Sequence, residues 1–135
     1  MTSSCPVLVD SNVLLDATEK DEHWADWSQD QMSLFVGRLV VDPIVYSELC
    51  YEAGKVEDVD AVLIALGIGF EELPRQALFL ASQAFRLYRE RVGNKTAPLP
   101  DFFIGAHAAA QGIPILTRDA GRYRTYFPAV ELICP

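Results

Sequence analysis

The sequence predicts an α/β fold, with one three-layer α/β/α domain over residues 1–135 and a mostly parallel sheet of about five strands between helices. Two observations predict this class. Short apolar runs of strand length alternate along the chain with longer segments of helical periodicity. Helix-capping residues and glycines separate these segments, and no repeat or low-complexity tract interrupts them. Such alternation favours parallel strands joined by right-handed helical crossovers.

The apolar runs supply the expected strands. The run that begins at Pro6 ends in Asp10, and Leu39–Val41 is a second short run. The expected strands cover residues 6–10, 39–41, 68–73, 113–116 and 130–133. Continuous apolar runs of this length are typical of strands that are buried on both faces.

Capping signals bound the expected helices. Asp42 and Pro43 form a strong helix start, with an acid at the N-cap and proline at the first helical position. Gly67 and Gly112 are each expected to end a helix. The first expected helix begins at residue 11. The next ones cover residues 22–35, 43–53, 56–66, 74–91 and 101–111. An irregular segment or short helix is expected over 118–127.

The composition indicates a globular protein of the cytoplasm. Half of the residues are hydrophobic and 22% are charged, which allows a buried core. The three cysteines are odd in number and have no metal-binding spacing, which argues against a disulfide framework or a cysteine zinc site. No signal peptide is visible, and the longest apolar run, residues 61–70, is shorter than the roughly 20 residues needed to span a bilayer. We therefore expect no membrane association.

The charge is unevenly distributed. The net charge of −8 argues, taken alone, against a polyanionic partner. Residues 1–67 carry 13 acids and three bases, whereas residues 68–135 carry six acids and eight bases. Arg118 and Arg122 belong to the basic second half and are candidates for phosphate contacts, although solvated helix faces explain single arginines equally well.

Four acids come from four separate segments that meet at one edge of the expected sheet. Asp10 ends the first strand and Asp119 follows the fourth. Glu48 lies on the helix after the second strand, and Asp101 opens the helix before the fourth. Ligands of parallel α/β sheets bind outside the carboxyl ends of the strands. The four carboxylates are therefore candidates for one site.

Close carboxylates repel each other, so some must stay protonated unless a cation joins them. Carboxylate ligands suit Mg²⁺ or Mn²⁺, which can activate a water for in-line attack on a phosphodiester. A bound cation would also reverse the local field that a phosphate meets. Each acid has an ordinary alternative, because Asp10 and Asp101 can cap helices, Asp119 can start a turn, and Glu48 can lie on a solvated face.

Four motifs together resemble the PIN-domain family, and in particular its VapC-type ribonuclease toxins. They are Val7–Leu15, Pro43–Leu49, Leu99–Ala108 and Ile115–Asp119, and their order and spacing agree with the family over nearly the whole chain. The resemblance implies a parallel sheet of about five strands between helices. It also implies an endoribonuclease that depends on Mg²⁺ or Mn²⁺, with an RNA substrate, a cognate VapB-like antitoxin and a homodimeric state.

The same resemblance implies roles for particular residues. Asp10, Glu48, Asp101 and Asp119 are expected to be the catalytic, metal-binding acids, with Asp119 the least direct because asparagine is also common there. Ser11 and Thr117 match hydroxyl positions of the family and are auxiliary candidates, together with Asn12. Arg118 and Arg122 become candidates for contact with RNA.

Four other polar and aromatic residues have less certain positions in the sequence pattern. We expect Asp16 on a solvated face, with an outer-shell role as the alternative. His107 is six positions after Asp101, about 240° around a helix, so we expect it to pack away from that acid. Trp24 and Trp27 are expected in the core or in a groove for a partner segment.

Three alternative functions compete with the toxin. One is a nuclease of the same fold that acts in RNA processing or on DNA. A phosphatase of the haloacid-dehalogenase type also uses an acid after the first strand, but it needs a second acid where this chain has Asn12. A non-catalytic binding module is the third.

Overall fold

The structure, a computed structural model, describes residues 5–92 and 99–135. At its centre is a sheet of five strands in the order β3-β2-β1-β4-β5, and each neighbouring pair is parallel. The strands are β1 (Val7–Val9), β2 (Leu39–Val41), β3 (Gly69–Phe70), β4 (Ile115–Leu116) and β5 (Leu132–Ile133). The expectation of a parallel α/β fold is confirmed.

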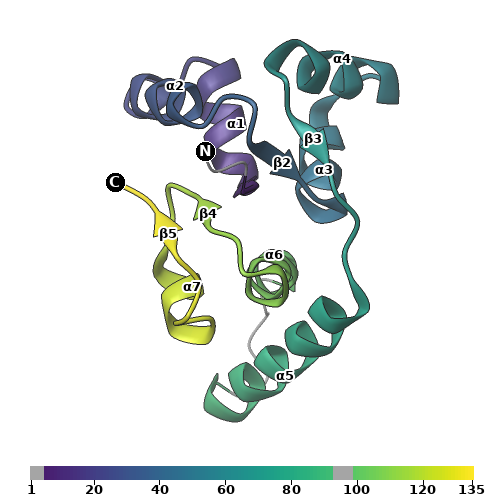
Figure 1. Ribbon diagram of the computed structural model, residues 1–135, viewed down its shortest axis with the longest axis vertical. Helices are drawn as coiled ribbons and strands as arrows, with labels where there is room; N and C mark the ends of the chain where they lie inside the picture. The colour runs from purple at the N-terminus through teal and green to yellow at the C-terminus, as the bar shows by residue number, and fades with distance from the viewer. Residues whose placement is uncertain (1–4, 93–98) are drawn as a thin grey trace.

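Helices flank the sheet, with α1, α2 and α4 toward one end of the molecule and α5, α6 and α7 toward the other (Figure 1). They are α1 (Ser11–Thr18), α2 (Ala25–Leu34), α3 (Pro43–Leu49), α4 (Val56–Leu66), α5 (Arg75–Val92), α6 (Leu99–Gln111) and α7 (Gly121–Tyr126), with a 3₁₀ turn, η1 (Cys50–Glu52), after α3. No described helix is both long and apolar enough to cross a membrane.

The capping signals act as predicted at several ends. The Asp42 side chain accepts hydrogen bonds from the backbone N–H groups of Ile44 and Val45, with Pro43 at the start of α3. Gly67 and Gly112 follow α4 and α6 with φ of 69° and 64°, a left-handed conformation that favours glycine.

Some predicted boundaries are wrong. The helix expected over 43–53 ends at Leu49 and continues as η1, because Cys50 and the residues after it take the tighter 3₁₀ turn. The helix expected from residue 101 begins at Leu99, so Asp101 lies within its first turn. The segment 118–127 contains the short helix α7.

Two hydrophobic clusters stabilise the fold. The larger one joins the strands to the helices packed against them and contains the fully buried Val7, Leu8 and Val9 of β1. The second joins three alanines of α5 to Phe102 of α6 and to Phe127. Because Phe102 follows Asp101, this second cluster fixes the start of α6 and with it the position of that acid.

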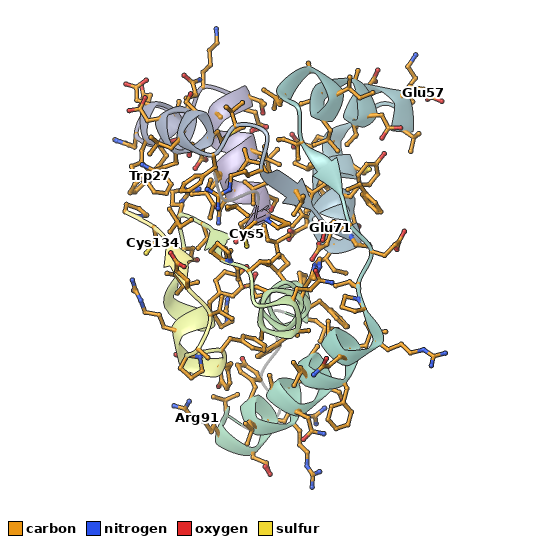
Figure 2. The ribbon with its side chains drawn as sticks, viewed as in Figure 1. Cys5, Trp27, Glu57, Glu71, Arg91 and Cys134 are labelled. Atoms are coloured by element: carbon orange, nitrogen blue, oxygen red, sulfur yellow. The ribbon has the colours of Figure 1, made fainter. Side chains whose placement is uncertain are left out.

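The three cysteines lie away from the fully buried core, with Cys5 exposed and Cys50 and Cys134 half-buried. Figure 2 shows two of them, Cys5 before β1 and Cys134 after β5.

Candidate functional site: an acidic cluster at the carboxyl edge of the sheet

A buried polar residue directly follows each of the three central strands. Asp42 follows β2, Asp10 follows β1 and Thr117 follows β4. Asp10 is 5% exposed, and the other two are fully buried. Since these strands are adjacent and parallel, the three residues lie along one edge of the sheet. This edge includes the point between β1 and β4 where the strand order reverses, which is the usual ligand position in such sheets.

Asp10 is the most buried of the four acids predicted to form the site. Its Oδ1 accepts a hydrogen bond from the N–H of Ser11 at 2.8 Å, so it also caps α1. Its Oδ2 accepts hydrogen bonds from the hydroxyls of Thr117 and Tyr123, each at 2.9 Å. Burial is the main cause that raises the pKa of Asp10, and these hydrogen bonds lower it in part. Four donors, including Asn12 Nδ2 at 3.5 Å, therefore fix the orientation of this carboxylate.

Glu48 is joined to Asp10 through the residue between them. Ser11 Oγ donates to Glu48 Oε1 at 2.9 Å, while the N–H of Ser11 donates to Asp10. Glu48 is half-buried on α3, and burial raises its pKa. The negative charges of Asp10 and Asp101 raise it further. Ser11 thus holds two acids of one charged cluster.

Of the four acids, Asp101 forms an ion pair with a basic side chain of the described residues. Arg122 Nη1 donates to its Oδ2 at 2.8 Å. Burial raises the pKa of Asp101 and outweighs the opposing effect of Arg122, and the charge of Asp119 raises it as well. Arg122 therefore neutralises the cluster only partly.

Asp119 is placed differently from the other three acids. It is exposed, and its backbone N–H donates to Thr117 Oγ1 at 3.1 Å. The Thr117 hydroxyl in turn donates to Asp10. Asp119 is therefore tied to the site through its backbone, and its carboxylate acts on Asp101 through charge.

The structure thus places all four predicted acids in one electrostatically linked region. Within the described residues, no three metal-ligating side chains already lie close enough together to hold an ion. The donor chemistry nevertheless fits a hard divalent cation, because Asp10, Glu48 and Asp101 offer carboxylate oxygens whose ionised forms are disfavoured without one.

The prediction that Asp16 lies on a solvated face is wrong. Asp16 is 7% exposed, and its Oδ1 accepts a hydrogen bond from Arg118 Nη2 at 3.2 Å. The Arg118 guanidinium also lies over the Trp24 ring, 5.6 Å from its centroid. The arginine that neutralises Asp16 is distant in sequence, and the helical pattern of α1 alone does not reveal it. Arg118, a candidate RNA contact, is therefore partly committed to internal contacts.

Two further residues belong to the site although the sequence analysis assigned them no role there. Tyr123 is 1% exposed and donates to Asp10, and burial beside the acids raises its pKa, so it stays a hydrogen-bond donor. Its only sequence signal is an aromatic residue within the irregular segment after β4.

The second is His107, which is fully buried, with Nδ1 3.0 Å from Asp42 Oδ2. It packs inside the fold, as expected, and it links α6, which carries Asp101, to the cap of α3, which carries Glu48. His107 Nε2 is buried and has no hydrogen-bond partner among the described residues.

Comparison with known proteins identifies the family to which the chain belongs. A family model described as PIN domain matches residues 7–128. No curated protein matches the chain significantly.

Solved structures of similar fold include two VapBC complexes and a VapC toxin. A chain of DNA-bound VapBC from Salmonella typhimurium is similar with a TM-score of 0.69 and 20% identity, over 96% of this chain and 98% of that one. VapBC2 from Rickettsia felis, bound to a promoter DNA fragment, gives 0.68 and 18% over 95% and 97%. VapC20 from Mycobacterium tuberculosis, described as a toxin that cleaves the sarcin–ricin loop, gives 0.64 and 14% over 93% and 98%.

The raised pKa of Glu48 predicts a pH-dependent cost in stability. Its folded pKa lies above the ordinary value of 4.5, so its contribution favours folding below that value and is lost as the pH rises through the folded pKa. Without added divalent cations, we expect Glu48→Gln to melt at a higher temperature than the wild type near pH 7. The difference should shrink as the pH falls to about 4.

The matched control is Glu57→Gln, an exposed acid at the start of α4. Thermal melts of all three proteins across this pH range measure the effect. A wild type that is the more stable protein at pH 7, or a difference that does not change with pH, would contradict the prediction.

Proposed function

The chain belongs to the PIN domain family, and on this premise we propose that it is a divalent-metal-dependent endoribonuclease and the toxin of a type II toxin–antitoxin pair. The observation that carries the proposal is the cluster of Asp10, Glu48 and Asp101, three carboxylates with raised pKa values at the carboxyl edge of a parallel sheet. Structural stability gives no reason to gather them, because ionising them together opposes folding.

In this proposal Asp10, Glu48 and Asp101 hold Mg²⁺ or Mn²⁺. Asp119 assists from the rim, directly or through water. When bound, the cation supplies a hydroxide-like nucleophile from water and neutralises charge on the phosphodiester. We also propose that residues 1–135 form one domain.

The protein's own residues orient the acids. Tyr123 and Thr117 fix Asp10 with two hydroxyl donors, each at 2.9 Å. Ser11 sets the distance between Asp10 and Glu48 by donating to both. Asn12 accepts from the Arg118 N–H at 3.2 Å, which ties the start of α1 to the loop that carries Asp119. Such preorganisation reduces the rearrangement needed when a cation and substrate bind.

RNA is the proposed substrate class. The similarity in fold to VapC20, a toxin described as cleaving the sarcin–ricin loop, supports it. Because the chain has a net charge of −8, we expect RNA to bind weakly unless a divalent cation is present. The alternatives of RNA processing or DNA cleavage use the same site and differ only in substrate.

A groove beside Glu48 is the proposed position of an antitoxin segment. It has a volume of about 400 Å³ and lies between α1, α3, η1 and α4. Its lining is apolar, with an acidic rim: Leu14, Leu15, Leu49, Tyr51, Val59, Val62 and Leu63, with Glu19, Glu52 and Asp58. An amphipathic helix with basic residues on its polar side fits such a surface. The VapBC complexes of similar fold support a partner of this kind.

A homodimer in the cytoplasm is also part of the proposal. Leu78, Phe79 and Leu87 of α5 are 44%, 63% and 57% exposed, which offers an apolar surface for a second copy. Light scattering of the purified protein measures this directly.

The nuclease proposal predicts that Asp10→Asn and Asp101→Asn each lower cleavage of a structured RNA by about 100-fold or more with Mn²⁺, because each removes a charged ligand. Asp26→Asn, an exposed acid on α2, should cleave like the wild type. Gel analysis of end-labelled RNA, with DNA of the same sequence in parallel, gives the rates. Undiminished cleavage in both site variants would sink the site assignment, and faster cleavage of DNA would reassign the substrate.

The antitoxin proposal predicts that Val62→Arg prevents rescue. Val62 is 44% exposed and lines the groove, so a cation there should repel a basic helix. Induction of the wild type should arrest growth, and we expect co-expression of a VapB-like antitoxin encoded next to its gene to restore growth. With Val62→Arg the arrest should persist, whereas Ile64→Arg, on the same helix but outside the groove, should still be rescued. Equal rescue of both variants would remove the partner from this groove.

A further inference from the structure

Arg122 stands apart from the other donors of the acidic cluster. Asp10 and Glu48 receive hydrogen bonds from neutral groups of Ser11, Thr117 and Tyr123. Asp101 instead receives the guanidinium of Arg122, with Nη1 2.8 Å from Oδ2. Of the four acids Asp10, Glu48, Asp101 and Asp119, Asp101 is the one that forms an ion pair among the described residues.

We propose that Arg122 competes with the divalent cation for Asp101 and that, once released, it binds a phosphate of the substrate. The proposal rests on the proposed function, because it takes Asp101 as a ligand of the cation. It adds that this chain contains a positively charged group of its own at the same carboxylate.

The geometry of α7 places Arg122 for both roles. The neighbouring Tyr123 is buried and bonded to Asp10, so the backbone at this point is fixed beside the cluster. The Arg122 side chain itself is 42% exposed, and that of Asp101 is 31% exposed. An ion pair open to solvent to this extent contributes little net stability, so it can separate at small cost.

The chemistry of arginine suits an exchange of partners. A guanidinium binds carboxylate and phosphate oxygens with the same fork of N–H donors. A cation on Asp101 removes the attraction that holds Arg122 there, and the freed guanidinium then lies next to the position where a phosphodiester must come.

The other arginines of this segment have different partners and provide a matched control. Arg118 is held by Asp16 and lies over Trp24. Arg124, on α7 with Arg122, donates to Cys134 Sγ at 3.2 Å and forms no ion pair with the four acids within the described part of the chain. Arg124→Gln therefore removes the same charge from the same helix without changing the pairing of Asp101.

Calorimetric titration with Mn²⁺ at pH 7, in the absence of RNA, tests the first role. We expect Arg122→Gln to bind Mn²⁺ about two- to fivefold more tightly than the wild type, the range set by loss of an exposed ion pair. Arg124→Gln should bind like the wild type. Equal affinity of Arg122→Gln and the wild type, or equal tightening by both variants, would overturn the competition.

Cleavage kinetics at saturating Mn²⁺ test the second role. We expect Arg122→Gln to raise the KM for RNA several-fold, and Arg122→Lys to recover part of the loss because it restores the charge without the fork. An unchanged KM in Arg122→Gln would overturn the phosphate contact.

The outcomes also separate this inference from the proposed function. If neither the wild type nor Arg122→Gln binds Mn²⁺, the metal site itself is wrong. If the wild type binds Mn²⁺ and Asp10→Asn does not, the metal site stands, and the comparison of Arg122→Gln with Arg124→Gln then decides the role of Arg122 alone.

Discussion

The buried carboxylate of Asp10 is the constraint on which the rest of the site depends. It lies at the end of the central strand, where an ionised group is costly unless donors surround it. The fold supplies those donors from both sides of β1, with Ser11 from α1 and with Thr117 and Tyr123 from the segment after β4. These hydrogen bonds lower the pKa of Asp10 but do not offset burial. The Asp10 carboxylate is therefore held in a fixed orientation, but its negative charge is not fully compensated by its neutral donors.

The neighbouring acids Glu48 and Asp101 are also positioned by polar contacts, which reach them through intermediate residues. Glu48 is fixed through Ser11, and the buried contact between Asp42 and His107 joins the helices that carry Glu48 and Asp101. A change of position in α3 or α6 would disturb a fully buried polar pair, so these helices are coupled. Preorganisation of this kind suits a site whose acids must stay close together despite their repulsion. In the proposed function, a bound cation would offset the local stability that this repulsion costs.

The sequence predicted those parts of the molecule that depend on local patterns. The parallel arrangement of the strands follows from their alternation with helices, and the start of α3 at Asp42 follows from the capping chemistry of one dipeptide. The features it missed depend on residues far apart in the chain. Asp16 has the pattern of a polar position on an exposed helix face, and only the fold shows that it accepts a hydrogen bond from Arg118. Tyr123 donates to Asp10 although 113 positions separate the two residues. Side-chain pairings of this range have no periodicity, so a single sequence does not reveal them.

We propose that Asp10 and Asp101 share one divalent cation at the carboxyl edge of the sheet. A crystal structure of the protein grown with Mn²⁺, with anomalous data collected at the manganese absorption edge, measures this directly. We expect an anomalous peak within about 2.3 Å of a carboxylate oxygen of each residue, with the guanidinium of Arg122 turned away from Asp101. A peak at another position, or no peak while the pair of Arg122 and Asp101 stays intact at saturating Mn²⁺, would contradict it.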